Sequence, residues 1–209
     1  MDQFFAGLRS PILVFSIALL LVAPGFAQTQ GEQSESAAKF PSTPGARPFS
    51  LVDHTGQPTT DKNFRGEYML VLFGYTHCPD FCPTGLAMMI EAIRQLGNDG
   101  AQVRPIFISV DGRRDTVDVL ARFVGAFHPR LVGLTGTPEQ IHQAATSYGV
   151  IYMIAEVRGE YSVFHTGYTY LVGPDGNILK TFPNGINAED MTEAIRGYLG
   201  PEEETDKTT

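Results

Sequence analysis

Apolar runs alternate with amphipathic stretches over residues 48–200, and this alternation predicts the elements of one folded domain. Two continuous apolar runs, Tyr68–Tyr75 and Val103–Val110, are typical of strands that are buried on both faces. Each is followed by a stretch with helical spacing of its apolar residues, Pro83–Leu96 and Asp115–Phe127. The first half of the domain is therefore predicted to have the order strand, helix, strand, helix.

The second half begins with a short predicted strand, Leu131–Leu134, and a helix that ends near Gly149. Thr137, Pro138 and Gln140 combine a hydroxyl cap, a proline in the first turn and a capping-box amide, which is typical of a helix start. Shorter segments then predict a hairpin, two further strands and a last helix capped by Asn187: Val150–Val157, Tyr161–His165, Thr169–Val172, Ile178–Phe182 and Ala188–Leu199.

The order of these elements predicts the fold class. A βαβ unit followed by an antiparallel ββα unit is the thioredoxin-like arrangement, and the right-handed crossover rule leaves few other ways to connect them. We therefore expect an α/β protein with a thioredoxin-like fold. Residues 114–148 add an inserted helix-strand-helix segment that makes the domain larger than the minimal fold.

The two ends of the chain have a different pattern. Residues 1–27 contain the apolar run Pro11–Ala23, which is shorter than the ~20 residues that span a bilayer. We interpret them as a signal peptide cleaved after Ala27 or as an N-terminal membrane anchor. Both alternatives place the domain outside the cytoplasm, in the periplasm, free or anchored in the inner membrane. Residues 28–47 are predicted to be a flexible linker, and residues 201–209 a disordered acidic tail.

Composition narrows the classes of function. The 209 residues include 23 acidic and 15 basic side chains, and the formal charge of −8 argues against nucleic acid as a partner. The chain has only two cysteines, Cys78 and Cys82, which excludes a disulfide-dense scaffold. Nothing in the pattern indicates an oligomer, and we expect a monomer.

The two cysteines lie where the first predicted strand meets its helix. At positions i and i+4 of a first helical turn, Cys78 and Cys82 share one face, so they can form a disulfide or bind one metal ion. A helix N-terminus favours thiolate over thiol, and we expect the pKa of both cysteines to fall. The alternative is an inert buried pair.

His165 is the third candidate. Three residues separate the cysteines where a thioredoxin-type redox motif has two, and the segment before Thr169 lacks the proline of dithiol exchangers. His165 stands close to that place and, in the predicted fold, faces the cysteine loop. Two thiolates and one imidazole favour Cu(I), and imidazole also suits Cu(II), whereas a structural zinc site would need a fourth ligand. The alternative is an ordinary structural or surface histidine.

The segment Gly74–Thr84, GYTHCPDFCPT, resembles the signature of the Sco/SenC family, the copper-binding assembly factors of cytochrome c oxidase with a thioredoxin fold. The resemblance continues in the same order along the domain, through Phe107–Asp111, Arg114–Thr116, Phe127–Pro129, Gly133–Thr137, Phe164–Thr166 and Tyr170–Gly176. The chain departs from the family at Gly112, where proline is usual, and at Thr166, where serine is common.

The resemblance implies that Cys78, Cys82 and His165 bind one copper ion, Cu(I) or Cu(II), per monomer. It also implies a copper chaperone that delivers copper to the dinuclear site of cytochrome c oxidase subunit II and receives it from an upstream donor protein. Under this hypothesis the protein is not an enzyme. The alternative is a thiol–disulfide oxidoreductase that keeps the cysteines of subunit II reduced, with Cys78 as nucleophile and Cys82 as resolving thiol. A copper or redox sensor is a third hypothesis, which no residue singles out.

Several other residues are weaker candidates. Asp80 could touch the metal, although a solvated turn aspartate is the favoured interpretation. A packing role is favoured for His77, core packing for Met88 and Met89, and a structural or exposed role for His54, His128 and His142. Asp111, at the end of a strand, is a candidate for a supporting role. Three tyrosines are candidates for shielding the site from water: Tyr75, Tyr168 and Tyr170.

Overall fold

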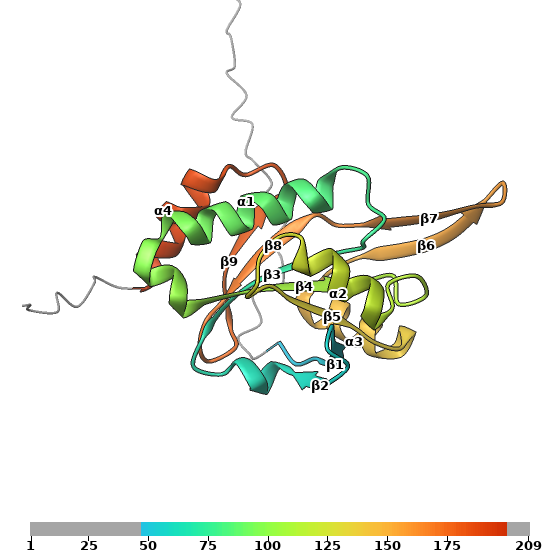
Figure 1. Ribbon diagram of the computed structural model, residues 1–209, viewed down its shortest axis with the longest axis horizontal. Helices are drawn as coiled ribbons and strands as arrows, with labels where there is room; N and C mark the ends of the chain where they lie inside the picture. Colours follow the sequence, from blue (N-terminus) through green and yellow to red (C-terminus); the bar gives the residue numbers. More distant parts are fainter. Residues whose placement is uncertain (1–46, 200–209) are drawn as a thin grey trace, which may run out of the picture. The chain divides into compact units, whose positions relative to one another are not determined.

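A seven-stranded mixed sheet forms the centre of the computed structural model, which describes residues 47–199 (Figure 1). The strands lie in the order β2-β1-β5-β4-β3-β8-β9. Strands β3, β4 and β5 are parallel, and the pairs β1–β2, β1–β5, β3–β8 and β8–β9 are antiparallel. The strands span Ser50–Asp53 (β1), Pro58–Thr60 (β2), Tyr68–Gly74 (β3), Val103–Ser109 (β4), Val132–Thr135 (β5), Tyr168–Val172 (β8) and Ile178–Pro183 (β9).

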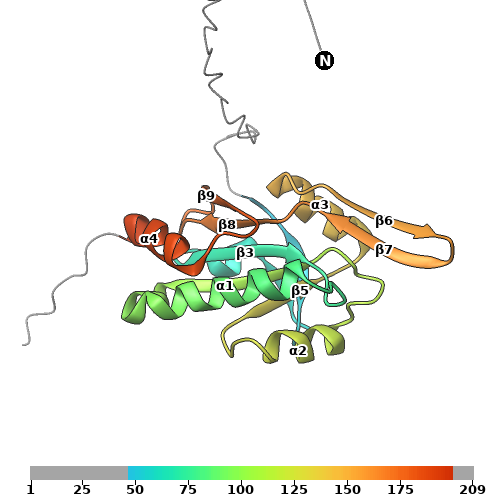
Figure 2. The same cartoon turned by 90° about the horizontal axis from the view of Figure 1, so that it is seen from above.

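Helices cover both faces of this sheet because the central strands are apolar on both sides. Leu70 and Leu72 of β3 face α1 (Phe81–Gln95), α2 (Val117–Gly125) and α4 (Ala188–Leu199), which share one apolar core with them. Met69, Val71 and Phe73 face the other side and pack with α3 (Pro138–Tyr148). Figure 2 shows α1 beside α4, with α3 on the opposite face of the sheet. Two short 3₁₀ helices, η1 (Asp61–Phe64) and η2 (Gly97–Gln102), complete the helical elements of the described residues.

The predicted fold class is confirmed. The parallel β3–α1–β4 unit and the antiparallel β8–β9–α4 unit make the thioredoxin-like arrangement, and α2, β5 and α3 form the inserted helix-strand-helix segment. Two predicted helix caps are also confirmed. The Gln140 N–H donates to Thr137 Oγ1 at 3.3 Å, and the Asp190 N–H donates to Asn187 Oδ1 at 2.8 Å. Helix α2 begins later than predicted, at Val117, because the hydroxyl of Thr116 caps it.

Strands β1 and β2 were not predicted from the sequence. They have four and three residues, too few to show an alternating pattern. Pairing with each other and with β5 makes them strands, and that pairing is a tertiary contact.

The predicted hairpin is present, but it forms a second sheet of its own. Strands β6 (Tyr152–Val157) and β7 (Glu160–His165) pair only with each other within the described residues and extend away from the central sheet (Figures 1 and 2). The turn at Arg158 and Gly159 has positive φ at both residues, 54° and 81°, as a two-residue hairpin turn requires. The hairpin is therefore held to the domain by side chains and by its ends.

The predictions for the two ends of the chain fall mostly outside the described residues. These are the signal peptide or anchor (1–27), the linker (28–47) except Arg47, and the acidic tail (201–209). Between residues 47 and 199, no helix has the length and apolar character needed to cross a bilayer. The domain limits 48–200 stay a prediction.

Candidate metal centre

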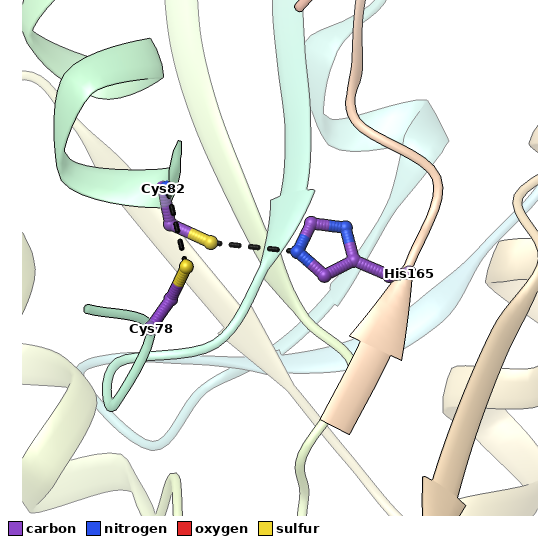
Figure 3. Close-up of side chains that lie close together, drawn as sticks. All are labelled: Cys78, Cys82 and His165. Atoms are coloured by element: carbon purple, nitrogen blue, oxygen red, sulfur yellow. Dashed lines mark hydrogen bonds between the residues drawn. The ribbon is translucent and has the colours of Figure 1, made fainter. Parts of the chain in front are cut away.

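Cys78, Cys82 and His165 lie together at the end of β3, as the sequence predicts (Figure 3). Their two Sγ atoms and a ring nitrogen lie within 4.8 Å of one another. Cys82 Sγ is 3.5 Å from His165 Nε2, and the backbone N–H of Cys82 donates to Cys78 Sγ at 3.4 Å. The three ligand atoms therefore surround a space of the size that one metal ion occupies.

The end of β3 brings the helix start close to the sheet. Helix α1 begins at Phe81, two residues before the predicted Pro83, so Cys82 belongs to its first turn and is buried. The prediction that both cysteines lie on this helical turn is wrong for Cys78, which lies in the loop before the helix. A Cβ added at Gly74 would lie 2.8 Å from Cys82 Sγ and 2.8 Å from the ring of Phe107. A side chain at position 74 would therefore push Cys82 away from its place.

The His165 ring is oriented by its neighbours. It ends β7, and its Nδ1 lies 3.0 Å from the carbonyl oxygen of Thr166, which makes Nδ1 the protonated nitrogen and leaves the Nε2 lone pair directed at Cys82. Tyr75 packs edge-on against the ring at a centroid distance of 5.9 Å. Burial lowers the pKa of His165, although the Thr166 carbonyl partly opposes this effect. The imidazole is therefore neutral at neutral pH, as a ligand must be.

The two thiols differ, which corrects the prediction that both pKa values fall. Burial alone would raise the pKa of Cys78, but hydrogen bonds from the Cys82 thiol and the N–H groups of residues 80–82 outweigh it, so the pKa lies below that of an ordinary thiol. Burial raises the pKa of Cys82, and the neighbouring Cys78 thiolate raises it further. The helix N-terminus thus activates the outer cysteine, while the inner one stays a thiol without metal.

Two weaker candidates near the cysteines are exposed. Asp80 precedes α1 as its N-cap and faces solvent, as favoured from the sequence. The packing role predicted for His77 is wrong: 53% of its side chain is exposed, and its Nδ1 lies 3.0 Å from Thr76 Oγ1. Its Nδ1 also lies 3.7 Å from the buried Asp115 carboxylate, so the ring is held at the surface of the loop by polar contacts and not by apolar packing.

The remaining candidates divide between the core and local hydrogen bonds. Met89 is fully buried and Met88 packs at the edge of the same core, as predicted. Tyr75 lies against the site, whereas Tyr170 is buried in the core against Phe73, so its predicted shielding role is wrong. The other three histidines are structural or exposed, as expected: His54 and His128 accept backbone N–H groups, and His142 faces solvent.

Asp115 is a supporting residue that sequence reasoning missed. Its buried carboxylate accepts hydrogen bonds from the N–H of Thr76 at 2.8 Å, from the Thr76 hydroxyl at 2.7 Å and from Ser109 at 2.6 Å. It thereby fixes the loop that leads to Cys78. The position of Asp115 could have indicated this role, because it lies in the segment that follows β4, as does Asp111, which was a candidate from the sequence.

Asp111, the candidate for a supporting role, is fully buried and bonded to Arg114 and Tyr161. An open cavity of about 230 Å³ lies above this group, beside the cysteine loop. Its lining comes from the loop after β3, from Arg114 and from β7: Tyr75, His77, Arg114, Tyr161, Ser162, Val163 and Phe164. Its lining includes Tyr75, which packs against His165, so the cavity adjoins the site.

Known proteins are similar to this chain in sequence and in fold. The model of the SCO1/SenC family matches residues 38–200. The mitochondrial SCO2 homologue of Bos taurus is 40% identical over 172 residues, which cover 80% of this chain and 65% of the relative. The chain thus spans about two thirds of that protein's length.

Solved structures agree. Arabidopsis thaliana ScoI with copper bound is 41% identical, with a TM-score of 0.67 over 71% of this chain and 93% of that one. Bradyrhizobium japonicum ScoI with copper bound is 39% identical, with a TM-score of 0.66 over 72% and 97%. Together with the family match over most of the described domain, these similarities show that the chain belongs to the SCO1/SenC family.

Proposed function

We propose that this protein is a copper chaperone that binds one copper ion through Cys78, Cys82 and His165. The observation that carries the proposal is the convergence of the three ligand atoms within 4.8 Å. Two soft sulfur atoms and one imidazole nitrogen suit Cu(I), and the nitrogen also suits Cu(II). The copper-bound ScoI structures of two relatives support the same cargo.

The two cysteines have different tasks in this proposal. Cys78, half-exposed and with a lowered pKa, supplies the thiolate that meets the incoming metal. Cys82 is buried, and its proton leaves when the metal binds, because coordination deprotonates a thiol outright. His165 completes a three-coordinate site for Cu(I). Release follows by ligand exchange, in which thiols of a partner replace the protein ligands one at a time.

The proposed partner is cytochrome c oxidase subunit II, at its dinuclear copper site, with an upstream copper donor before it. Support comes from family membership, since a solved relative is described as a member of the Sco family of cytochrome c oxidase assembly proteins. We place the protein in the periplasm, either released by cleavage after Ala27 or tethered by an uncleaved anchor over Pro11–Ala27. The Bos taurus relative is mitochondrial.

A copper titration of the reduced protein tests the proposal, first with Cu(I) without oxygen and then with Cu(II). We expect one tight equivalent and sulfur-to-Cu(II) charge-transfer bands. In His165→Ala, Cu(II) affinity should fall sharply and the bands should change, while Cu(I) affinity falls less because both thiolates remain. Equal affinities in wild type and variant would remove His165 from the site, and the absence of tight binding would overturn the proposal.

A second function, thiol–disulfide exchange, is favoured by the lowered pKa of Cys78 beside the buried Cys82. The Cys78 thiolate would attack a partner disulfide and release one partner thiolate. The Cys82 thiol, losing its proton, would then attack Cys78 and release the second. The partner is reduced by two electrons, and the pair is oxidised to a Cys78–Cys82 disulfide. This function requires a metal-free pair, so the two activities alternate on one site.

A further inference from the structure

The hairpin that carries His165 has to be held in place without the central sheet. Strands β6 and β7 pair with each other, and the inward face of β7 presents Tyr161, Val163 and His165 at every second position. Val163 is buried in the core, and His165 reaches the cysteines. The contacts of the third inward side chain, Tyr161, therefore help to set the position of the end of β7, where His165 lies.

Tyr161 is bonded to the loop after β4. Its hydroxyl donates to Asp111 Oδ1 at 2.7 Å, and the carboxylate, itself fully buried, also accepts from Nε of Arg114. Burial first and then the Asp111 carboxylate raise the pKa of Tyr161 to about 12, so the hydroxyl keeps its proton and remains a donor. A hydrogen bond to a charged group is among the stronger ones in proteins.

Arg114 extends this contact to the cysteine loop. Its guanidinium lies 4.3 Å from the centroid of the Tyr161 ring and 5.8 Å from that of Tyr75. Tyr75 in turn packs against His165, and its carbonyl accepts the N–H of Cys78 at 3.2 Å. One cation thus contacts an aromatic ring of the hairpin and another of the loop before the cysteines. A more exposed pair, Arg113–Glu156, adds little because solvent screens it.

We propose that Tyr161, Asp111 and Arg114 form a clamp that holds β7 against the cysteine loop and so positions His165 beside the two thiols. Tyr161 and Arg114 are then positioning residues for copper, acting through His165 without contacting the metal. The inference rests on the proposed function, because it assumes that copper binds Cys78, Cys82 and His165. A ligand held in advance loses less conformational freedom on binding, so the clamp raises affinity for copper.

Tyr161→Phe in the full chain removes the hydroxyl and keeps the ring on which Arg114 stacks. We expect the affinity for Cu(II), measured with Cu(II) chloride against a competing chelator, to fall about 3- to 10-fold. The charge-transfer bands and the nitrogen hyperfine structure in the electron paramagnetic resonance spectrum should change. Cu(I) affinity should change less than about twofold, since both thiolates remain. Asp111→Asn, which weakens both arms of the clamp, should act in the same direction.

Tyr152→Phe is the matched control. Tyr152 lies opposite His165 on the same hairpin, and its ring packs near His142, so this variant removes a hydroxyl outside the clamp. It should keep the wild-type spectrum. The double variant Tyr161→Phe/His165→Ala tests the route of the effect: if Tyr161 acts through His165, its loss adds nothing once the imidazole is gone. A merely stabilising role would lower the melting temperature and leave the copper spectrum unchanged.

The outcomes separate the clamp from the proposed function. A wild-type affinity and spectrum in Tyr161→Phe, beside a sensitive His165→Ala, overturns the clamp alone. A loss that persists in full in the double variant also overturns it. A wild-type protein whose copper spectrum does not respond to His165→Ala overturns the ligand set, and the clamp with it.

Discussion

At the scale of single residues, two cysteines four positions apart at one helix start have thiols of different acidity. Cys78 is half-exposed at the helix start, where backbone N–H groups stabilise its thiolate. Cys82, four positions later, is buried beneath it, and burial raises its pKa more than the backbone hydrogen bond at Tyr75 lowers it. The outer sulfur is therefore the reactive one, both toward metal and toward disulfides.

This difference predicts selective alkylation of the reduced, metal-free protein. At pH 7, below the pKa of an ordinary thiol, a lowered pKa enlarges the thiolate fraction of Cys78, whereas the raised pKa of Cys82 keeps it protonated. Iodoacetamide should modify Cys78 at least about ten times faster than Cys82, as peptide mass spectrometry would measure. In denaturant the two rates should converge. Equal rates in the folded protein, or a faster Cys82, would contradict the assignment of the nucleophile.

At the scale of elements, the junction of β3 and α1 depends on a residue without a side chain. Gly74 ends the strand where Cys82 Sγ and the Phe107 ring approach its backbone. Phe107 belongs to β4 and is fully buried, so it has no room to move. Close packing of β3, β4 and the first turn of α1 therefore sets the position of Cys82 Sγ.

Gly74→Ala should consequently disturb both stability and copper binding. We expect the free energy of unfolding in urea to fall by about 1–3 kcal/mol, the usual cost of overpacking a core. Cu(I) affinity should fall with it, because Cys82 must shift. Gly197→Ala is the matched control: it lies in α4 with no atom near an added Cβ, and it should be neutral or stabilising by about 0.5–1 kcal/mol. Wild-type stability in Gly74→Ala would show that the junction can relax.

At the scale of the whole domain, the candidate ligands come from two parts of the described structure whose strands belong to separate sheets. The cysteines belong to the turn and helix beside the central sheet, and His165 belongs to the separate hairpin. A metal ion bound by all three would connect these parts directly. Copper binding should therefore reduce the motion of the hairpin more than that of the sheet.

Amide hydrogen exchange can measure this coupling. With one equivalent of Cu(I), exchange in the β6–β7 peptides should slow by about tenfold, while peptides of β3 and β4 stay unchanged because they already belong to the core. His165→Ala should abolish the slowing in the hairpin and keep that around Cys78. Uniform slowing in every element, or none in the hairpin, would argue against a ligand from β7.

The sequence by itself determined the order of the elements and the location of the chemistry. These follow from local rules: apolar runs mark buried strands, and Thr137 and Asn187 cap their helices through their own neighbours. The spacing of the two cysteines also located them at the junction of the first buried strand and its helix, although only Cys82 lies in α1. Strands β1 and β2 were not predicted, because their strand structure depends on pairing with each other and with β5.

The tertiary structure alone decided how the site is completed and tuned. His165 lies 83 positions from Cys82 and Tyr161 lies 50 positions from Asp111, so only the packing of the hairpin brings these pairs within bonding distance. The rise in the pKa of Cys82 depends on its burial in the core between α1 and the sheet, which the spacing of the cysteines does not reveal. Helix and strand propensity depends on neighbouring residues in the sequence. Burial and long-range contacts form only when the chain folds, so the sequence pattern does not reveal them.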